Sequence, residues 1–369
     1  MTDPRQLLPK TVSILEIGLN TRLHIGAQVY VSLRGGTVAD FAIGEARRGV
    51  PMRTDTSMMW YSAGKPITAV AIGQLLERGR LTLDTRIGAL IPEFDNQGKA
   101  DITLRHLLTH TGGFRSADNL DVELGWADAL AAVCLAPLEP DWVPGQRAGY
   151  HTMSSWFVLG EIVRRLDGRP LEVYAREEIF LPLGLGESRL GMTPDVFQAL
   201  GDRLGVIHTT LQGEPAPLPF WDTEGGSCPC KPGSNARGPI RDLGRFYEML
   251  LRGGEGRGRR VLQPATAELL TRRHRVGLFD DTFKTVMDWG LGFIVNSVRH
   301  GEAVVPYGFG RHAADAAFGH GGWQSSCALA DPSRDLVVAW ICNGCPGEYR
   351  HKQRTHDLNS AVYEDLGLV

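Results

Sequence analysis

The segment Ser62-Ala63-Gly64-Lys65-Pro66 opens an apolar run that continues to about residue 78. Ser62 and Lys65 are three residues apart, so on the first turn of a helix both side chains lie on one face. Pro66 fits that placement, because the N–H that proline lacks has no intrahelical partner in a first turn. The positive end of the helix dipole also favours negative charge that develops beside Ser62. The spacing therefore predicts that Lys65 reaches the Ser62 hydroxyl.

Both ends of the chain carry strand patterns around this segment. A helix is expected over residues 7–19 and a strand over 27–33, and the turn residues at 34–36 connect it to a second strand over 38–43. A second hairpin is expected from residues 326–330 and 336–341. We therefore expect an antiparallel sheet whose strands come from both ends of the chain.

The middle of the chain is dominated by helical patterns. Helices are expected over residues 66–78, 104–108, 127–134, 154–166 and 240–251, and residues 253–258 are expected to form a glycine-rich surface loop. The predicted fold class is α+β: an antiparallel sheet flanked by N- and C-terminal helices, with a mainly helical inserted domain and the active site between the two. The expected sheet domain comprises residues 1–65 and 205–369, and the helical domain comprises 66–204.

Composition excludes several classes of function. The 369 residues suffice for two lobes, and 43% hydrophobic with 22% charged residues is ordinary for a globular protein. A net charge of −3 without a basic stripe argues against nucleic acid as a partner. No N-terminal signal pattern and no apolar run of bilayer length is visible, so we expect no membrane partner and a cytoplasmic location.

A Ser-x-x-Lys match occurs by chance in many chains of this size, and alone it would indicate a surface helix. Here three further motifs follow it in order: the segment 104–113, Pro144-Gly145 before Tyr150, and His320-Gly321-Gly322. With these four motifs the sequence resembles the serine β-lactamase and penicillin-binding-protein superfamily, and most closely its class C-like esterase and transacylase branch. The resemblance extends from Ala27 to the C-terminal helix.

The resemblance implies a role for each motif residue. Ser62 would be the nucleophile, Lys65 its partner and Tyr150 the third catalytic side chain, and the backbone N–H groups of Ser62 and Trp323 would form the oxyanion hole. A serine hydroxyl needs an adjacent base, and a neutral lysine or a tyrosinate could each serve. Which of the two takes the serine proton stays open at this point.

Two substitutions separate the chain from the family pattern. Thr152 stands where the Tyr-x-Asn motif has asparagine, and His320 stands where many relatives have lysine. Both changes weaken recognition of an acylamino carboxylate, since threonine offers one hydroxyl and an unperturbed histidine is mostly neutral at pH 7. The residues expected to contact substrate are Thr152, His320, Gly321, Gly322 and Trp323.

We therefore expect a carboxylic-ester hydrolase or an acyltransferase that works through an acyl-enzyme on Ser62. Its partners would be a small-molecule ester or thioester as acyl donor and an alcohol or amine as a possible acceptor, with no cofactor and no metal. A β-lactamase or D-aminopeptidase-type hydrolase is the alternative. A more remote alternative is a non-catalytic binding protein of the same fold.

Other candidate residues have simpler explanations. Cys228-Pro-Cys230 with Cys342 and Cys345 could form a zinc site, but one of the two pairs lacks the usual CxxC spacing. His106 and His110 have metal-ligand spacing without a zincin glutamate, so packing roles are favoured. We expect His110 and the glycines after it to end a helix and turn the chain. Trp60 and Tyr61 are expected in the core, whereas Trp323 fits core and pocket equally well.

Overall fold

The computed structural model describes residues 3–211, 213–301 and 305–369. Within these ranges one antiparallel sheet has the strand order β13-β14-β15-β16-β17-β1-β2-β3. In that order the strands span Asp288–Trp289, Ile294–Val295, Phe318–Gly322, Ser326–Asp331, Leu336–Cys342, Gly26–Leu33, Gly36–Arg47 and Val50–Pro51. The predicted α+β class and the antiparallel sheet are confirmed.

The centre of the sheet joins the two ends of the chain. Strand β1 pairs with β17 so that Ala27 lies opposite Cys342 and Leu33 lies opposite Leu336. The expected hairpins are β1–β2 and β16–β17, and β2 is longer at both ends than its apolar core suggested. Strands β13 to β15 extend the sheet on the β16 side, and the sequence pattern had not predicted β13 and β14.

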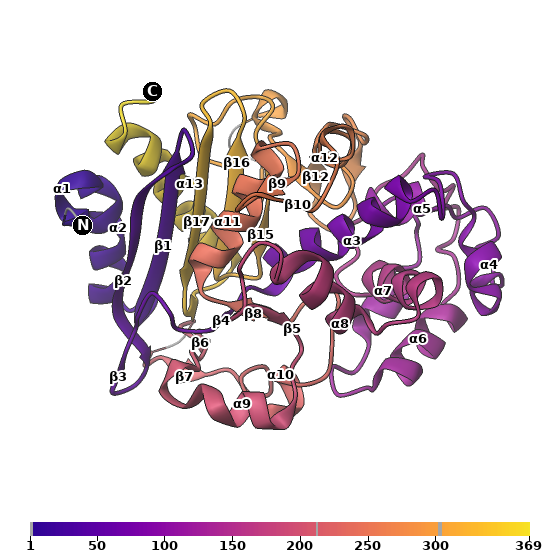
Figure 1. The fold of residues 1–369 in the computed structure, drawn as a ribbon, viewed down its shortest axis with the longest axis horizontal. Helices are drawn as coiled ribbons and strands as arrows, with labels where there is room; N and C mark the ends of the chain where they lie inside the picture. The colour runs from indigo at the N-terminus through magenta and orange to yellow at the C-terminus, as the bar shows by residue number, and fades with distance from the viewer. Residues whose placement is uncertain (1–2, 212, 302–304) are drawn as a thin grey trace.

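Helices cover both faces of the sheet because its side chains alternate in direction. Val29 and Val31 pack in the cluster that contains α2 (Pro9–Asn20) and α13 (Glu348–Asp365), while Tyr30 between them packs with α11 (Ile240–Leu251) on the other face. Figure 1 shows α2 and α13 beside the sheet near the two chain ends. The helices expected over 7–19 and 240–251 differ from α2 and α11 by no more than two residues at either end.

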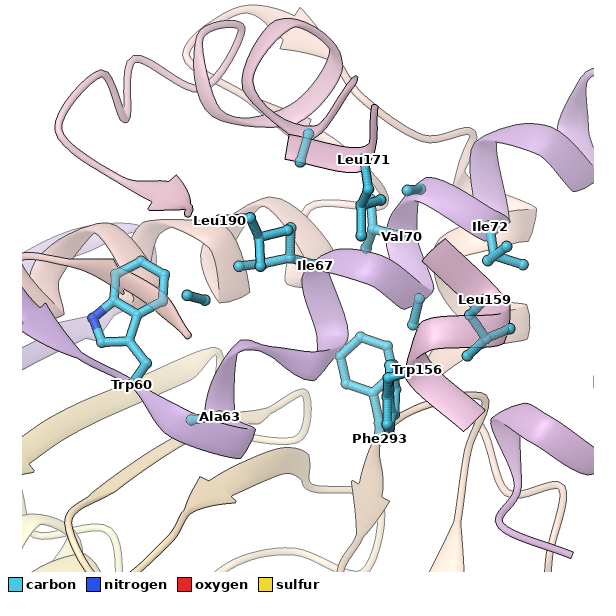
Figure 2. Packing of buried hydrophobic residues seen from close by; sticks show 14 of the residues in the cluster. Trp60, Ala63, Ile67, Val70, Ile72, Trp156, Leu159, Leu171, Leu190 and Phe293 are labelled. Atoms are coloured by element: carbon cyan, nitrogen blue, oxygen red, sulfur yellow. The ribbon is translucent and has the colours of Figure 1, made fainter. Parts of the chain in front are cut away.

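A group of helices lies beyond the sheet, at the right of Figure 1. They are α3 (Lys65–Glu77), α4 (Ile87–Leu90), α5 (Leu104–Leu108), α6 (Trp126–Leu135), α7 (Ser154–Asp167) and α8 (Leu171–Ala175). Helix α3 is buried on every side from Lys65 to Leu75, which explains why its sequence is apolar without a clear polar face. Figure 2 shows Ile67 and Val70 of this helix packed among Trp156, Leu171 and Leu190.

Short elements complete the described chain. They are α1 (Pro4–Leu7), α9 (Pro194–Leu200), α10 (Glu224–Ser227), α12 (Pro264–Thr271), β4 (Met58–Met59), β5 (Arg189–Leu190), β6 (His208–Thr209), β7 (Ala216–Pro217), β8 (Ala236–Gly238), β9 (Glu255–Gly256), β10 (Arg259–Arg260), β11 (Phe279–Asp280), β12 (Thr285–Val286) and β18 (Gly344–Cys345). The expected loop at 253–258 was only partly right, because β9 and β10 pair as a small hairpin around its glycine turn.

Candidate active site

Ser62 lies in a 3₁₀ turn, Tyr61–Gly64, that directly precedes α3. The sequence had placed Ser62 on the first turn of the α-helix itself, which is wrong by one turn, since α3 begins at Lys65. Strand β8 holds the turn: the Trp60 backbone N–H donates to the Ala236 carbonyl at 2.8 Å, and its indole N–H donates to the Gly238 carbonyl at 3.0 Å. The backbone that carries Ser62 is therefore fixed from one side.

Strand β15 approaches the same turn from the other side. The Ser326 hydroxyl donates to the Trp60 carbonyl at 2.8 Å, and a Cβ on Gly322 would lie 2.1 Å from that carbonyl oxygen. Only glycine allows so close an approach. Trp323 follows directly, and its ring meets the Tyr61 ring edge-on at 5.7 Å. Ser62 and Trp323, whose N–H groups are the predicted oxyanion donors, thus lie on adjoining segments.

Lys65 is fully buried beneath Ser62. Its Nζ lies 2.9 Å from Ser62 Oγ, 2.8 Å from the Thr152 carbonyl oxygen and 2.6 Å from the Gly233 carbonyl oxygen. Burial lowers the pKa of Lys65 from 10.5 to about 7, and the charge of Asp118 opposes this only in part. An amine that donates its two hydrogens to the two carbonyls directs its remaining lone pair at Ser62 Oγ.

Tyr150 lines the same cavity as Ser62, and Lys65 Nζ lies 5.3 Å from the centre of its ring. Its ring is buried, and the ring centroids of His110 and Phe283 lie 4.7 Å and 4.8 Å from that of Tyr150. The Tyr150 backbone N–H donates to Asp280 Oδ1 at 3.1 Å. Burial raises the pKa of Tyr150, and a hydrogen bond with Ser62 works in the opposite direction. The phenol is therefore protonated at neutral pH. The fold brings Ser62, Lys65 and Tyr150 together, as the sequence predicted.

His320 lies in the middle of β15, and its side chain lines the same pocket. Its Nδ1 lies 2.7 Å from the Gly321 carbonyl oxygen, which can only accept, so Nδ1 carries the hydrogen and Nε2 is an acceptor. Nε2 is buried and has no protein partner within the described part of the chain. Burial and the nearby charge of Lys65 lower the pKa of His320 to about 3, so the ring is neutral at pH 7.

These side chains open into a cavity of about 690 Å³. Ser62, Tyr150, Thr152, His320, Gly321 and Trp323 line it, as do Tyr61, Met153, Trp221, Ser234, Thr282, Phe283, Ile294, Pro306, Tyr307, Glu348, Tyr349, His351 and Lys352. Trp323 is 42% exposed, so it belongs to the pocket rather than the core. Tyr61 was expected in the core, and it is buried but also reaches the pocket wall, whereas Trp60 is wholly buried.

The sequence profile of the beta-lactamase family matches residues 18–362. The chain belongs to this family. Penicillin-binding protein 4 of Amycolatopsis lactamdurans is 30% identical over 338 residues, which cover 88% of this chain and 83% of that protein. Esterase/beta-lactamase LipL of Mycobacterium tuberculosis is 26% identical, over 86% of this chain and 77% of that protein.

A solved structure shares the fold over nearly the whole chain. The crystal structure of a penicillin-binding-protein homolog from Caulobacter crescentus superposes with a TM-score of 0.79 at 28% identity and covers 97% of both chains. Family membership and these neighbours indicate a serine hydrolase of the beta-lactamase fold. The described ranges contain no helix whose apolar stretch is long enough to cross a bilayer.

Several pocket residues of this beta-lactamase-family chain were missed from sequence. Trp221, Phe283, Tyr307 and Glu348 come from segments far apart in the chain, and none carries a local motif. Glu348 is the first residue of α13, where an acidic residue is ordinary for a helix start, so its position suggested no site. Only the tertiary fold brings these residues to the cavity that Ser62 lines.

The two histidines with metal-ligand spacing have local hydrogen bonds. His106 Nδ1 accepts from the Thr103 N–H at 3.1 Å at the start of α5, and His110 Nδ1 accepts from the His151 N–H at 3.0 Å. His110 turns the chain after α5 with φ of +58°, a conformation expected at the glycines, of which Gly113 also has positive φ. Throughout the described ranges no three His, Cys, Asp or Glu side chains could hold a metal together, and the cysteines are free thiols.

Proposed function

We propose that this protein is an acyl-transfer enzyme in which Ser62 attacks a small carboxylic ester or thioester and becomes acylated. The single observation that carries the proposal is the position of Lys65 Nζ, 2.9 Å from Ser62 Oγ and within hydrogen-bond distance of two carbonyl oxygens. Carbonyl acceptors occupy the amine's hydrogens, and burial brings its pKa to about 7. A buried, partly neutral amine is the base that a serine nucleophile requires.

The proposed first step transfers the Ser62 proton to Lys65 as Oγ attacks the carbonyl carbon. The carbonyl π-electron pair moves to oxygen, and the N–H groups of Ser62 and Trp323 donate to the oxyanion, each worth about 3 to 4 kcal/mol in comparable sites. Collapse of this intermediate breaks the bond to the leaving group. We assign the base role to Lys65 rather than Tyr150, because burial keeps Tyr150 protonated.

Tyr150 remains available as a proton donor and relay. Tyr150 lines the same cavity as Ser62, so its phenol can pass a proton to the departing oxygen or sulfur, which leaves as an alcohol or thiol. Lys65 then returns its proton to Tyr150. Water, an alcohol or an amine then attacks the acyl-enzyme by the reverse sequence, and Ser62 recovers its hydrogen.

Three features support an ester rather than a cell-wall peptide or penicillin. His320 is neutral where a lysine would hold a substrate carboxylate, and Thr152 presents a hydroxyl in place of a carboxamide. The relative LipL is named as both an esterase and a beta-lactamase. Beta-lactam hydrolysis remains the second candidate, since the relative with 30% identity is a penicillin-binding protein.

Covalent labelling tests the proposal. Intact-protein mass spectrometry after treatment with p-nitrophenyl butyrate or a serine-directed phosphonate should show one adduct on the wild type and none on Ser62→Ala. Ser154→Ala is the matched control, since this hydroxyl is buried in the helical region and contacts His151. An adduct that persists in Ser62→Ala would show that the nucleophile is another residue. Adding an alcohol and analysing products by chromatography separates hydrolysis from transfer.

A further inference from the structure

A carboxylate that the Ser62 chemistry does not use lines the pocket. Glu348, the first residue of α13, is part of the cavity wall together with Trp323 and Tyr307. We propose that Glu348 binds a cationic group of the substrate, an alkylammonium, and thereby makes positively charged esters the preferred substrate class. The inference rests on the proposed acyl transfer at Ser62 and names the substrate class of that site.

Neutral groups hold the Glu348 carboxylate in place. The Tyr307 hydroxyl donates to its oxygens at 3.0 and 3.3 Å, and the Gln324 side-chain amide donates at 3.0 Å. Gln324 is fixed in turn, because its amide oxygen accepts from the Gly347 N–H at 2.7 Å. Gln324 follows Trp323 in sequence, so the carboxylate is positioned relative to the segment that faces Ser62.

The side chains that hydrogen-bond the Glu348 carboxylate in the described part of the chain are neutral. No ion pair to Glu348 forms within residues 3–211, 213–301 and 305–369. Lys352 lies one turn further along α13 and lines the same cavity, yet its amine is not within ion-pair distance of Glu348. A substrate cation that enters the cavity can therefore pair with this carboxylate without displacing a protein cation.

The remaining walls suit an alkylammonium. Trp221, Tyr307, Trp323 and Tyr349 give the cavity aromatic faces, and such faces attract cations within about 6 Å. His320 offers an acceptor nitrogen rather than a positive charge, so it does not repel a cation. A negative substrate group would instead meet Glu348. Glu348 and Lys352 both line the cavity, and Glu348 is the charged group that Tyr307 and Gln324 hold there, so a positive substrate group is favoured beside Glu348.

A matched pair of esters tests this preference. The p-nitrophenyl esters of 4-(trimethylammonio)butyrate and of 5,5-dimethylhexanoate have nearly the same shape and differ in one charge. We expect wild-type kcat/KM to favour the cationic ester by about tenfold or more, which corresponds to about 1.4 kcal/mol. In Glu348→Gln this ratio should fall toward one, and in Glu348→Lys it should fall below one. Glu268→Gln, an exposed site on α12, removes the same charge away from the cavity and should keep the wild-type ratio.

A binding measurement separates this inference from the acyl-transfer proposal. Isothermal titration of butyltrimethylammonium should give an affinity about tenfold weaker in Glu348→Gln than in the wild type, while Ser62→Ala should bind like the wild type. Equal affinity for wild type and Glu348→Gln, or a wild-type ester ratio near one, overturns the cation site. Absence of Ser62 labelling together with a Glu348-dependent affinity would overturn only the acyl-transfer proposal.

Discussion

Lys65 Nζ donates to the carbonyl oxygen of Gly233 at 2.6 Å, and the α-carbon of Gly233 faces the same amine. A Cβ at position 233 would lie 3.1 Å from Nζ and 3.0 Å from the ring of Trp156. These contacts are too tight to be relieved by Trp156, which is wholly buried. The residue at 233 therefore helps to set where the amine lies.

We expect Gly233→Ala to slow acylation of Ser62 by roughly 10- to 100-fold, because displacing a reacting group by a fraction of an ångström to 1 Å has effects of that order. Stopped-flow measurement of the p-nitrophenol burst gives the rate. Gly186→Ala is the control, since nothing lies within 4 Å of a Cβ at that position. A Gly233→Ala burst as fast as that of the wild type would show that Lys65 tolerates the added methyl group.

The acylation rate should depend on pH through Lys65. Burial lowers the Lys65 pKa to about 7, and only the neutral amine can accept the Ser62 proton. The rate should therefore be constant above about pH 8 and fall about tenfold per pH unit well below pH 7. Burst rates between pH 5.5 and 9 measure this. A rate that rises only near pH 10 would instead assign the base to a group with an ordinary lysine or tyrosine pKa.

Lys65 and Tyr150 should act as one unit. Lys65→Ala and Tyr150→Phe are each expected to slow acylation by about two to four orders of magnitude, the usual contribution of a positioned acid or base. Phenylalanine keeps the ring contacts with His110 and Phe283, so Tyr150→Phe changes only the hydroxyl. The double variant should lose less than the product of the single losses. A single variant with the wild-type burst rate would have no part in proton transfer.

A buried ion pair supports the pocket wall. Arg237 and Asp222 are 1% and 5% exposed and lie 2.6 Å apart, and Arg237 also donates to the Trp221 carbonyl. Asp222→Ala should lower the free energy of unfolding by about 3 to 5 kcal/mol, since it leaves a buried cation without its partner. Asp101→Ala breaks the exposed pair with Arg86 and should cost less than about 1 kcal/mol. Urea denaturation measures the free energy of unfolding of both variants. Equal losses in the two variants would show that the Arg237–Asp222 pair stabilises the fold no more than an exposed pair does.

Sequence patterns predicted the elements whose contacts join residues that are close together in the chain. The helix at Ile240–Leu251 and the hairpin β16–β17 follow from periodicity, and the Ser62–Lys65 contact follows from a spacing of three residues. The bounds of the two predicted domains are not tested by these contacts and stay a prediction.

The features that the sequence did not predict depend on contacts between residues that are far apart in the chain. Strands β13 and β14 are only two residues each; β14 pairs with the edge of β15, and β13 pairs in turn with β14. The acceptors of Lys65 are carbonyls at 152 and 233, which any residue type could supply. Tyr307 and Gln324 hold Glu348 at the pocket by hydrogen bonds. No motif or residue spacing in the chain predicts these hydrogen bonds.

His320 provides the test between ester and β-lactam substrates. Its neutral ring lacks the charge-assisted contact to a substrate carboxylate, which is typically worth about 1.5 to 3 kcal/mol. We expect wild-type kcat/KM for p-nitrophenyl butyrate to exceed that for nitrocefin by at least about tenfold at pH 8, a gap of about 1.4 kcal/mol. His320→Lys should narrow the gap by raising nitrocefin turnover, because it restores a cation at the pocket wall. His320→Gln is the matched control, since it changes the side chain without adding charge. Efficient hydrolysis of nitrocefin by the wild type at that pH would instead make β-lactams the substrate class of this pocket.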